Sequence, residues 1–289
     1  MTTVQLLQPV TPELRQWIIE QATAGAQPEA VLKSMLASGW REDVAVKALE
    51  ETLRGFLEER ARQAELPPPV PVPDPLRGLS ALPATLWAGD RDVRVLAEMK
   101  SPRVIVFGGL LSDDECDQLI ELARPRLARS ETVKTDTGAS EVNEARTSRG
   151  MFFARGETPL IDRIERRIAA LLGWPLVNGE GLQVLHYRPG AEYKPHYDYF
   201  DPVHPGSAPI LRRGGQRVGT VVMYLNTPKE GGGTTFPDVG LEVGPVKGNA
   251  VFFSYDRPHP STRSLHGGAP VVAGEKWVAT KWLREREFI

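Results

Sequence analysis

The chain has 289 residues, of which 41% are hydrophobic and 25% are charged, a composition typical of a globular protein. At about 150 residues per domain, this length predicts two domains. Because 35 Lys and Arg residues oppose 37 Asp and Glu residues, the net charge argues against a nucleic-acid partner and against attraction to an anionic membrane. The first ten residues carry neither a basic stretch nor a long apolar run, and no run of about 18 apolar residues follows, so we expect no secretory signal and no transmembrane helix. The single cysteine, Cys116, excludes an intrachain disulfide framework and fits a reducing compartment, so we expect a cytoplasmic protein.

Residues 1–64 contain three segments with helical periodicity. Thr11 followed by Pro12 is typical of the start of a helix, and apolar residues then recur on one helical face. A second segment begins at residues 27–29 and ends near Gly39, and a third begins at residues 41–43 with acidic side chains in its first turn. The sequence therefore predicts a small all-α bundle of three helices over residues 1–64.

Residues 65–100 are predicted to connect this bundle to a second domain. Six of the ten residues 66–75 are prolines, which excludes a helix or a central strand and predicts a stiff, extended linker. Residues 76–100 fit no single pattern, although residues 93–99 show a helical one, so this part is assigned to a connecting segment.

Residues 101–289 have a different sequence pattern, with two helical segments followed by short β-rich ones. A buried strand is predicted over residues 103–107, a helix begins at the capping box formed by Ser112 and Glu115, and a second helix spans about residues 159–172. Short β-rich segments follow, separated by Gly and Pro turns, at residues 182–187, 217–226, 240–244, 249–254 and 276–284. Helices followed by strands predict an α+β or sandwich domain, in which helices support a mostly antiparallel sheet.

The residues His196-Tyr-Asp198 give the strongest indication of chemistry. In an extended segment, residues i and i+2 point to the same face, so this His and this carboxylate can both reach one metal ion. A second His from elsewhere would complete the 2-His-1-carboxylate site that binds Fe(II) with open coordination positions. The composition leaves His259 and His266 as candidates, and the glycines after His266 allow a close backbone approach to a ligand.

The C-terminal two-thirds of the chain resembles the prolyl 4-hydroxylase family of 2-oxoglutarate, Fe(II)-dependent dioxygenases. The matching stretches keep their order and spacing, and they are residues 101–107, 111–117, 146–152, 182–200, 220–226, 231–237, 246–253, 264–266 and 274–282. The resemblance implies a double-stranded β-helix (a jelly roll, cupin-like) with supporting helices, over residues 101–289. It also implies Fe(II) as the metal, 2-oxoglutarate and O2 as cosubstrates, and ascorbate as a reductant.

The resemblance also assigns roles to individual residues. His196, Asp198 and His266 match the family's iron ligands, and Lys276 matches the lysine that pairs with the distal carboxylate of 2-oxoglutarate. Two further residues are expected to bind that cosubstrate, Tyr187 and Thr220. Four residues are expected near a peptide substrate, namely Tyr193 and Trp282 by resemblance and Arg212 and Arg213 because they lie in the Pro/Gly-rich loop 201–216.

These observations imply an enzyme that hydroxylates a C–H bond and releases succinate and CO2, with a prolyl residue of a peptide or protein as the favoured substrate. One alternative is the same chemistry on another residue or on a small molecule. Another is a non-catalytic binding protein that acts through the N-terminal helices, in which Val31–Leu49 resembles ubiquitin-associated-like three-helix modules. Whether or not the second domain is an enzyme, the N-terminal bundle is a candidate site for a protein partner.

Overall fold

The computed structural model describes residues 8–129, 131–133, 140–142 and 147–289. The first seven residues of the predicted bundle and Arg146 lie outside the described residues. By its internal contacts the chain divides into two compact units, residues 1–68 and 69–289.

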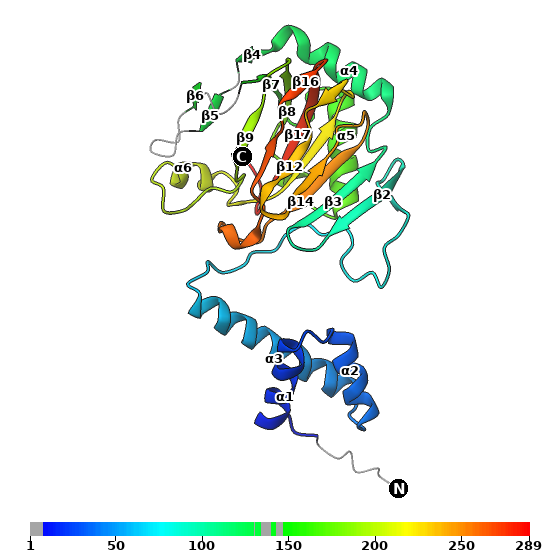
Figure 1. The fold of residues 1–289 in the computed structure, drawn as a ribbon, viewed down its shortest axis with the longest axis vertical. Coiled ribbons are helices and arrows are strands. Elements are labelled where there is room, and N and C mark those ends of the chain that lie inside the picture. Colours follow the sequence, from blue (N-terminus) through cyan, green and yellow to red (C-terminus); the bar gives the residue numbers. More distant parts are fainter. Residues whose placement is uncertain (1–7, 130, 134–139, 143–146) are drawn as a thin grey trace. The chain divides into compact units, whose positions relative to one another are not determined.

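The first unit consists of three helices, α1 (Pro12–Thr23), α2 (Pro28–Ala37) and α3 (Glu42–Gln63) (Figure 1). The side chain of Thr11 caps α1 by accepting a hydrogen bond from the backbone N–H of Leu14, as its position before Pro12 suggests. The three helices share a small apolar core of their own, formed by Ile18, Val31, Met35, Ala45, Ala48 and Leu49.

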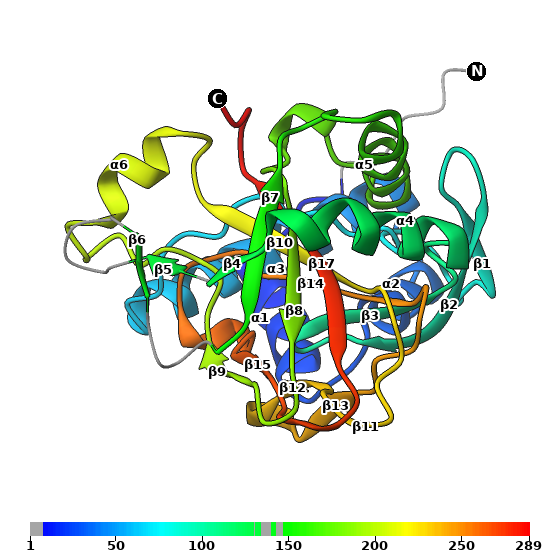
Figure 2. The same ribbon diagram turned by 90° about the horizontal axis from the view of Figure 1, so that it is seen from above.

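The second unit contains two main antiparallel sheets (Figures 1 and 2). The larger has nine strands in the order β1 (Thr85–Trp87), β2 (Asp92–Met99), β3 (Arg103–Gly108), β14 (Ala250–Ser254), β10 (Arg217–Tyr224), β17 (Lys276–Arg284), β8 (Leu182–Tyr187), β7 (Arg149–Phe153) and β4 (Ala128–Arg129). The smaller has four strands in the order β13 (Leu241–Val243), β12 (Thr234–Phe236), β15 (His266–Gly268) and β9 (Tyr193–His196). Two further pairs join β11 (Glu230–Gly231) with β16 (Val271–Ala273) and β5 (Glu131–Val133) with β6 (Ser140–Val142).

In its described part this unit also has three helices, α4 (Asp113–Ala123), α5 (Pro159–Leu172) and the short α6 (Ser207–Arg212). Single 3-10 turns lie at Arg124–Arg126, Leu176–Asn178, Pro237–Val239 and Pro260–Thr262. The predicted capping box of α4 is present, because Ser112 accepts from the backbone of Glu115 and Glu115 accepts from the backbone of Ser112. Figure 2 shows α4 and α5 on the same side of the large sheet.

The central strands of the large sheet are buried on both faces, and their side chains alternate between two cores. On β8 and β17, Val184 and Ala279 face the helices, whereas Leu185 and Val278 join a second core with Phe236 of the small sheet. The same strands therefore support the helices on one face and the small sheet on the other. This arrangement places the inward side chains of both sheets opposite each other.

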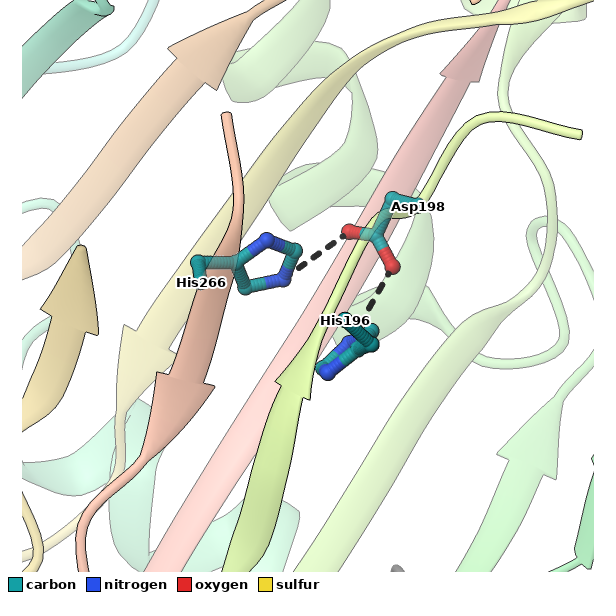
Figure 3. A group of neighbouring side chains, drawn as sticks. All are labelled: His196, Asp198 and His266. Atoms are coloured by element: carbon teal, nitrogen blue, oxygen red, sulfur yellow. Dashed lines mark ion pairs between the residues drawn. The ribbon is translucent and has the colours of Figure 1, made fainter. Parts of the chain in front are cut away.

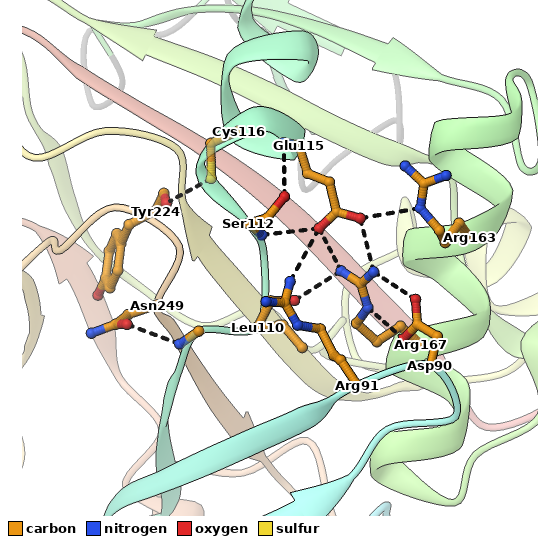
Figure 4. Close-up of polar contacts among 11 residues, drawn as sticks. Asp90, Arg91, Leu110, Ser112, Glu115, Cys116, Arg163, Arg167, Tyr224 and Asn249 are labelled. Atoms are coloured by element: carbon orange, nitrogen blue, oxygen red, sulfur yellow. Dashed lines mark hydrogen bonds and ion pairs between the residues drawn. The ribbon is translucent and has the colours of Figure 1, made fainter.

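A buried ion-pair network joins α4, α5 and the turn between β1 and β2 (Figure 4). The guanidinium of Arg167 donates to both carboxylate oxygens of Glu115, at 2.7 and 2.8 Å, and to both of Asp90, at 2.8 and 2.6 Å. Burial raises the pKa of Glu115, but Arg167 and the backbone of Ser112 outweigh this effect and bring that pKa down to about 2. Both helices are thereby fixed to the edge of the large sheet.

The structure departs from the sequence patterns of residues 65–100 in two places. Residues 93–99 form strand β2 rather than a helix, because they pair along their length with β3 and bury Val93 against the large sheet. The proline-rich stretch belongs to the second unit from residue 69 onward, since the backbone N–H of Val70 donates to Asp256 at 2.7 Å and Leu76 lies in the main core. Proline has no backbone N–H to donate within a sheet, so this stretch does not become a strand. It forms an extended segment, the strap (residues 69–76), whose N–H groups and apolar side chains contact the rest of the second unit.

Candidate active site

Strand pairing in the small sheet brings two histidines together. His196 ends β9 and lies directly opposite His266, the first residue of β15, although the two are far apart in the sequence. A Cβ atom at Gly267 would lie 2.9 Å from the carbonyl oxygen of Tyr193, so only glycine lets β15 approach β9 this closely. Gly267 and Gly268 also line the pocket, so the predicted close approach of their backbone to a ligand stays a prediction that this geometry permits.

Asp198 follows β9 and completes a three-residue cluster with these histidines (Figure 3). His196 Nε2 lies 3.6 Å from Asp198 Oδ1, and His266 Nε2 lies 3.4 Å from Asp198 Oδ2. The three potential ligand atoms all lie within 4.8 Å of one another, close enough for one metal ion. Two imidazoles and one carboxylate on one side of an ion are the ligands expected for non-haem Fe(II).

Hydrogen bonds orient both rings toward this centre. His196 Nδ1 lies 2.9 Å from the carbonyl oxygen of Lys194, and His266 Nδ1 lies 3.0 Å from that of Ser264. A carbonyl can only accept, so Nδ1 carries the proton in each ring and Nε2 offers its lone pair. Burial lowers the pKa of His196, which favours the neutral ring that a metal needs.

The carboxylate of Asp198 is buried and held in its ionised form. Burial alone would raise the pKa of Asp198, but the His266 and His196 rings outweigh burial and hold that pKa well below its usual range. Thr220 Oγ1 donates a hydrogen bond of 2.7 Å to Asp198 Oδ2. Its hydroxyl thus contacts the aspartate, but Thr220 also lines the pocket, and its role in binding the cosubstrate stays a prediction.

Lys276 provides a cation on the opposite wall of the site. Its side chain is 4% exposed, and its ammonium lies over the rings of Tyr187 and Tyr224, at 5.4 and 5.9 Å from their centroids. Burial lowers the pKa of Lys276 to about 8, and the charge of Glu242 opposes this shift without forming an ion pair. Within the described residues the ammonium thus lies buried without an anionic partner, which is costly unless a ligand supplies one.

The pocket that contains these groups lies between the two sheets. The large sheet contributes alternate residues of three strands, so that Tyr187, Lys276 and Trp282 share one face with apolar neighbours. The complete lining is Leu185, Tyr187, Tyr193, His196, Asp198, Thr220, Val222, Thr234, His266, Gly267, Gly268, Lys276, Val278, Thr280 and Trp282. A metal centre at one side and a cation at the other fit a ligand that chelates the metal and ends in a carboxylate.

Among the residues expected near a substrate, Tyr193 and Trp282 line this pocket. The ring of Tyr193 stacks on that of His196, with centroids 3.7 Å apart. Trp282 Nε1 is buried and has no hydrogen-bond partner among the described residues. Arg212 and Arg213 are not among the described residues that line the pocket; they are exposed, and Arg213 donates to the Ile289 carbonyl at 3.0 Å.

A group of residues behind Asp198 was not predicted from the sequence. Glu180 pairs in bidentate fashion with Arg217, at 2.7 and 2.8 Å, and Arg217 in turn lies 3.5 Å from the backbone oxygen of Asp198. Tyr255, 2% exposed, lies 3.0 Å from the hydroxyl of Thr220. Glu180 and Arg217 are charged residues next to apolar strand segments, a pattern that could have indicated a buried pair.

The other histidines lie outside the cluster. His259, the alternative to His266, uses Nδ1 to accept from the backbone N–H of Ser261 in a turn. His186 stacks on Trp277 and lies 2.7 Å from Glu275 on the helix-facing side of the large sheet. The structure therefore favours His266 as the second histidine of the site.

Comparisons with known proteins agree with this geometry. The family described as the 2OG-Fe(II) oxygenase superfamily matches residues 182–284. Prolyl 4-hydroxylase 5 of Arabidopsis thaliana is 41% identical over 222 residues, which cover 69% of this chain and 74% of that protein. Prolyl 4-hydroxylase 1 of the same plant is 43% identical over 225 residues, covering 69% and 78%. A solved structure, the 2OG complex of a viral collagen prolyl hydroxylase from Paramecium Bursaria Chlorella virus-1, is 32% identical, covers 63% of this chain and 95% of that chain, and has a TM-score of 0.48.

The protein is therefore an oxygenase that depends on 2-oxoglutarate and Fe(II), with O2 as the second cosubstrate. Within that class, the chain belongs to the prolyl 4-hydroxylase family, as its motifs predicted. Fe(II) and 2-oxoglutarate, with O2, are thereby confirmed as predicted, and the donor set of the cluster fits the metal. No helix in the described parts of the chain has the length and apolar character needed to cross a membrane.

Proposed function

We propose that this enzyme hydroxylates a prolyl residue in a peptide or protein, with release of succinate and CO2. The observation that carries the reaction class is the cluster of His196, Asp198 and His266, which shares one pocket with Lys276, a buried cation without an anionic partner among the residues that the structure describes. The prolyl substrate is supported by relatives named prolyl 4-hydroxylases, which are 41–43% identical to this chain.

Each residue of the pocket has a task in this proposal. His196, Asp198 and His266 hold Fe(II), and Lys276 pairs with the distal carboxylate of 2-oxoglutarate. When bound, Fe(II) and 2-oxoglutarate supply the oxidation, in which O2 delivers one oxygen atom to the C–H bond and the other to succinate. Leu185, Val222 and Val278 form apolar walls, and Tyr187 lies beside Lys276, so that the charge pair is kept away from water.

The substrate is expected at the rim formed by aromatic residues. Tyr193, packed on the His196 ring, and Trp282, with a free indole N–H in the described structure, flank the metal centre. We place Arg212 at most at the periphery of a bound peptide, since it is exposed on α6. Ascorbate is proposed as the reductant that maintains Fe(II).

The test is oxidation of proline-rich peptides by the full-length protein with Fe(II), 2-oxoglutarate and ascorbate, followed by mass spectrometry. We expect the gain of one oxygen atom on a proline, loss of activity in His266→Ala, and retained activity in His259→Ala as the matched control. Oxidation of another residue, or 2-oxoglutarate turnover with a small molecule alone, would support the alternative substrates. An active His266→Ala protein together with an inactive His259→Ala protein would show that His259, and not His266, is the second histidine ligand.

We further propose that the second unit is a double-stranded β-helix and that residues 1–64 are a separable bundle that binds a protein partner. Two facing antiparallel sheets support the former, and the separate apolar core of α1 to α3 supports the latter. A cytoplasmic location is supported by the one cysteine, Cys116, which is buried and unpaired. Cell fractionation tests the proposed location. Capture of partners with the isolated residues 1–68, compared with the full chain, tests the proposed role of the bundle.

A further inference from the structure

Asp198 is linked to a second buried hydroxyl beyond Thr220. Thr220 is 0% exposed and Tyr255 is 2% exposed, and their oxygen atoms lie 3.0 Å apart. Thr220 Oγ1 lies at 2.7 Å from Asp198 Oδ2 and donates to it. The three residues come from different elements, since Asp198 follows β9, Thr220 lies on β10 and Tyr255 follows β14.

The direction of both hydrogen bonds follows from the number of protons. An ionised carboxylate can only accept, so the single hydroxyl proton of Thr220 points to Asp198. Thr220 Oγ1 can then only accept from Tyr255, which makes the tyrosine the donor at the far end. Each donor polarises the next, so the chain Tyr255 to Thr220 to Asp198 strengthens the final bond to the carboxylate.

We propose that Thr220 and Tyr255 are positioning residues that fix the Asp198 carboxylate for metal binding. The hydroxyl chain holds Oδ2 and thereby fixes the Asp198 carboxylate with Oδ1 toward His196 and Oδ2 toward His266. Without this chain the carboxylate could rotate about its side-chain bonds, and the cluster would bind a metal ion less tightly. This inference rests on the proposed metal site and names the residues that tune it.

The chain offers a matched control for this inference. Tyr224 is a second fully buried tyrosine, and its hydroxyl donates to a threonine, Thr234 Oγ1, at 2.8 Å. That pair resembles the pair of Tyr255 and Thr220 in burial and chemistry, but it does not contact Asp198. A general effect of removing a buried tyrosine hydroxyl would therefore appear in both Tyr224→Phe and Tyr255→Phe.

The experiment measures binding of Co²⁺ alone to the full-length protein, by calorimetric titration and by the visible absorption of the bound ion. Loss of a residue that orients a metal ligand costs about 10- to 100-fold in metal affinity, which we expect for Thr220→Val. Thr220→Ser keeps the hydroxyl and should bind as the parent does. Tyr255→Phe should lose less than about 10-fold, and Tyr224→Phe should lose nothing.

The double variant separates positioning from a structural role. Once Thr220→Val has removed the link, adding Tyr255→Phe should change neither Co²⁺ affinity nor the absorption band any further. Equal losses from Tyr255→Phe in both backgrounds, parental affinity in Thr220→Val, or equal losses in Tyr224→Phe and Tyr255→Phe would each overturn the inference. If circular dichroism shows that Thr220→Val does not fold, the Co²⁺ affinities of Tyr255→Phe and Tyr224→Phe alone decide whether the inference holds. A parent protein that binds no Co²⁺ would instead refute the proposed metal site together with its tuning.

Discussion

Replacing Lys276 with alanine should abolish tight binding of 2-oxoglutarate while leaving the metal site intact. The ammonium is buried and has no anionic partner among the described residues, so the distal carboxylate of the cosubstrate is its expected counter-ion. Removing one partner of a buried, hydrogen-bonded charge pair costs on the order of 2–5 kcal/mol. At about 1.4 kcal/mol per factor of ten, the dissociation constant should rise by about 30-fold to several thousand-fold.

The assay is calorimetric titration of 2-oxoglutarate into the Mn²⁺-loaded protein without oxygen, so that binding is separated from turnover. Lys276→Arg should lose less than Lys276→Ala, because it keeps the charge but presents a planar fork in a space shaped by an ammonium. Lys194→Ala is the matched control, since Lys194 lies on β9 close to the metal cluster but is exposed. If Lys276→Ala binds 2-oxoglutarate as tightly as Lys194→Ala does, the assignment of Lys276 to the cosubstrate is refuted.

Three further predictions concern pH and stability. Because the pKa of Lys276 is lowered to about 8, the lysine is charged below that pH, and 2-oxoglutarate affinity measured by the same titration should fall about tenfold per pH unit above it. The pKa of Glu115 falls from 4.5 to about 2 on folding, so its contribution, about 3 kcal/mol, is complete above pH 4.5 and lost as the pH falls toward 2. In urea unfolding, Glu115→Gln should therefore destabilise the protein at pH 7 but hardly at pH 2, whereas Asp162→Asn, which removes an exposed ion pair, should cost less than about 1 kcal/mol. Deleting residues 1–68 should leave a folded second unit by thermal unfolding, whereas deleting residues 1–80 should not, because it removes the docked strap.

Elements with strong local signals were predictable from the sequence. The capping box at Ser112 and Glu115 marks the start of α4, and the apolar stripe of residues 159–172 marks α5. Runs of apolar residues between Gly and Pro turns located the central strands β8, β10 and β17. These signals are local because capping and strand burial depend on residues that are neighbours in the chain.

Elements that depend on distant partners were not predictable in this way. Residues 93–99 have a helical pattern, yet pairing with β3 makes them the strand β2. Likewise, six prolines indicate an extended segment but not whether it spans open solvent, and contacts with distant residues, such as those of Val70 with Asp256 and of Asp74 with Arg103, show that it docks. In the first case tertiary contacts decide the conformation of the segment, and in the second they decide where the extended segment lies.

The residues of the active site also differ in whether local sequence is enough to predict them. His196 and Asp198 are two residues apart, so an extended backbone is enough to predict that they face one ion. The choice between His259 and His266 needs the register of β15 against β9, which places only His266 opposite His196. The hydroxyls that hold Asp198 come from Thr220 on β10 and from Tyr255, which follows β14, and neither residue differs from an ordinary sheet residue until the sheet is assembled. A motif can therefore name the atoms that bind the metal, whereas the atoms that orient those ligands are defined only by how the strands pair and pack.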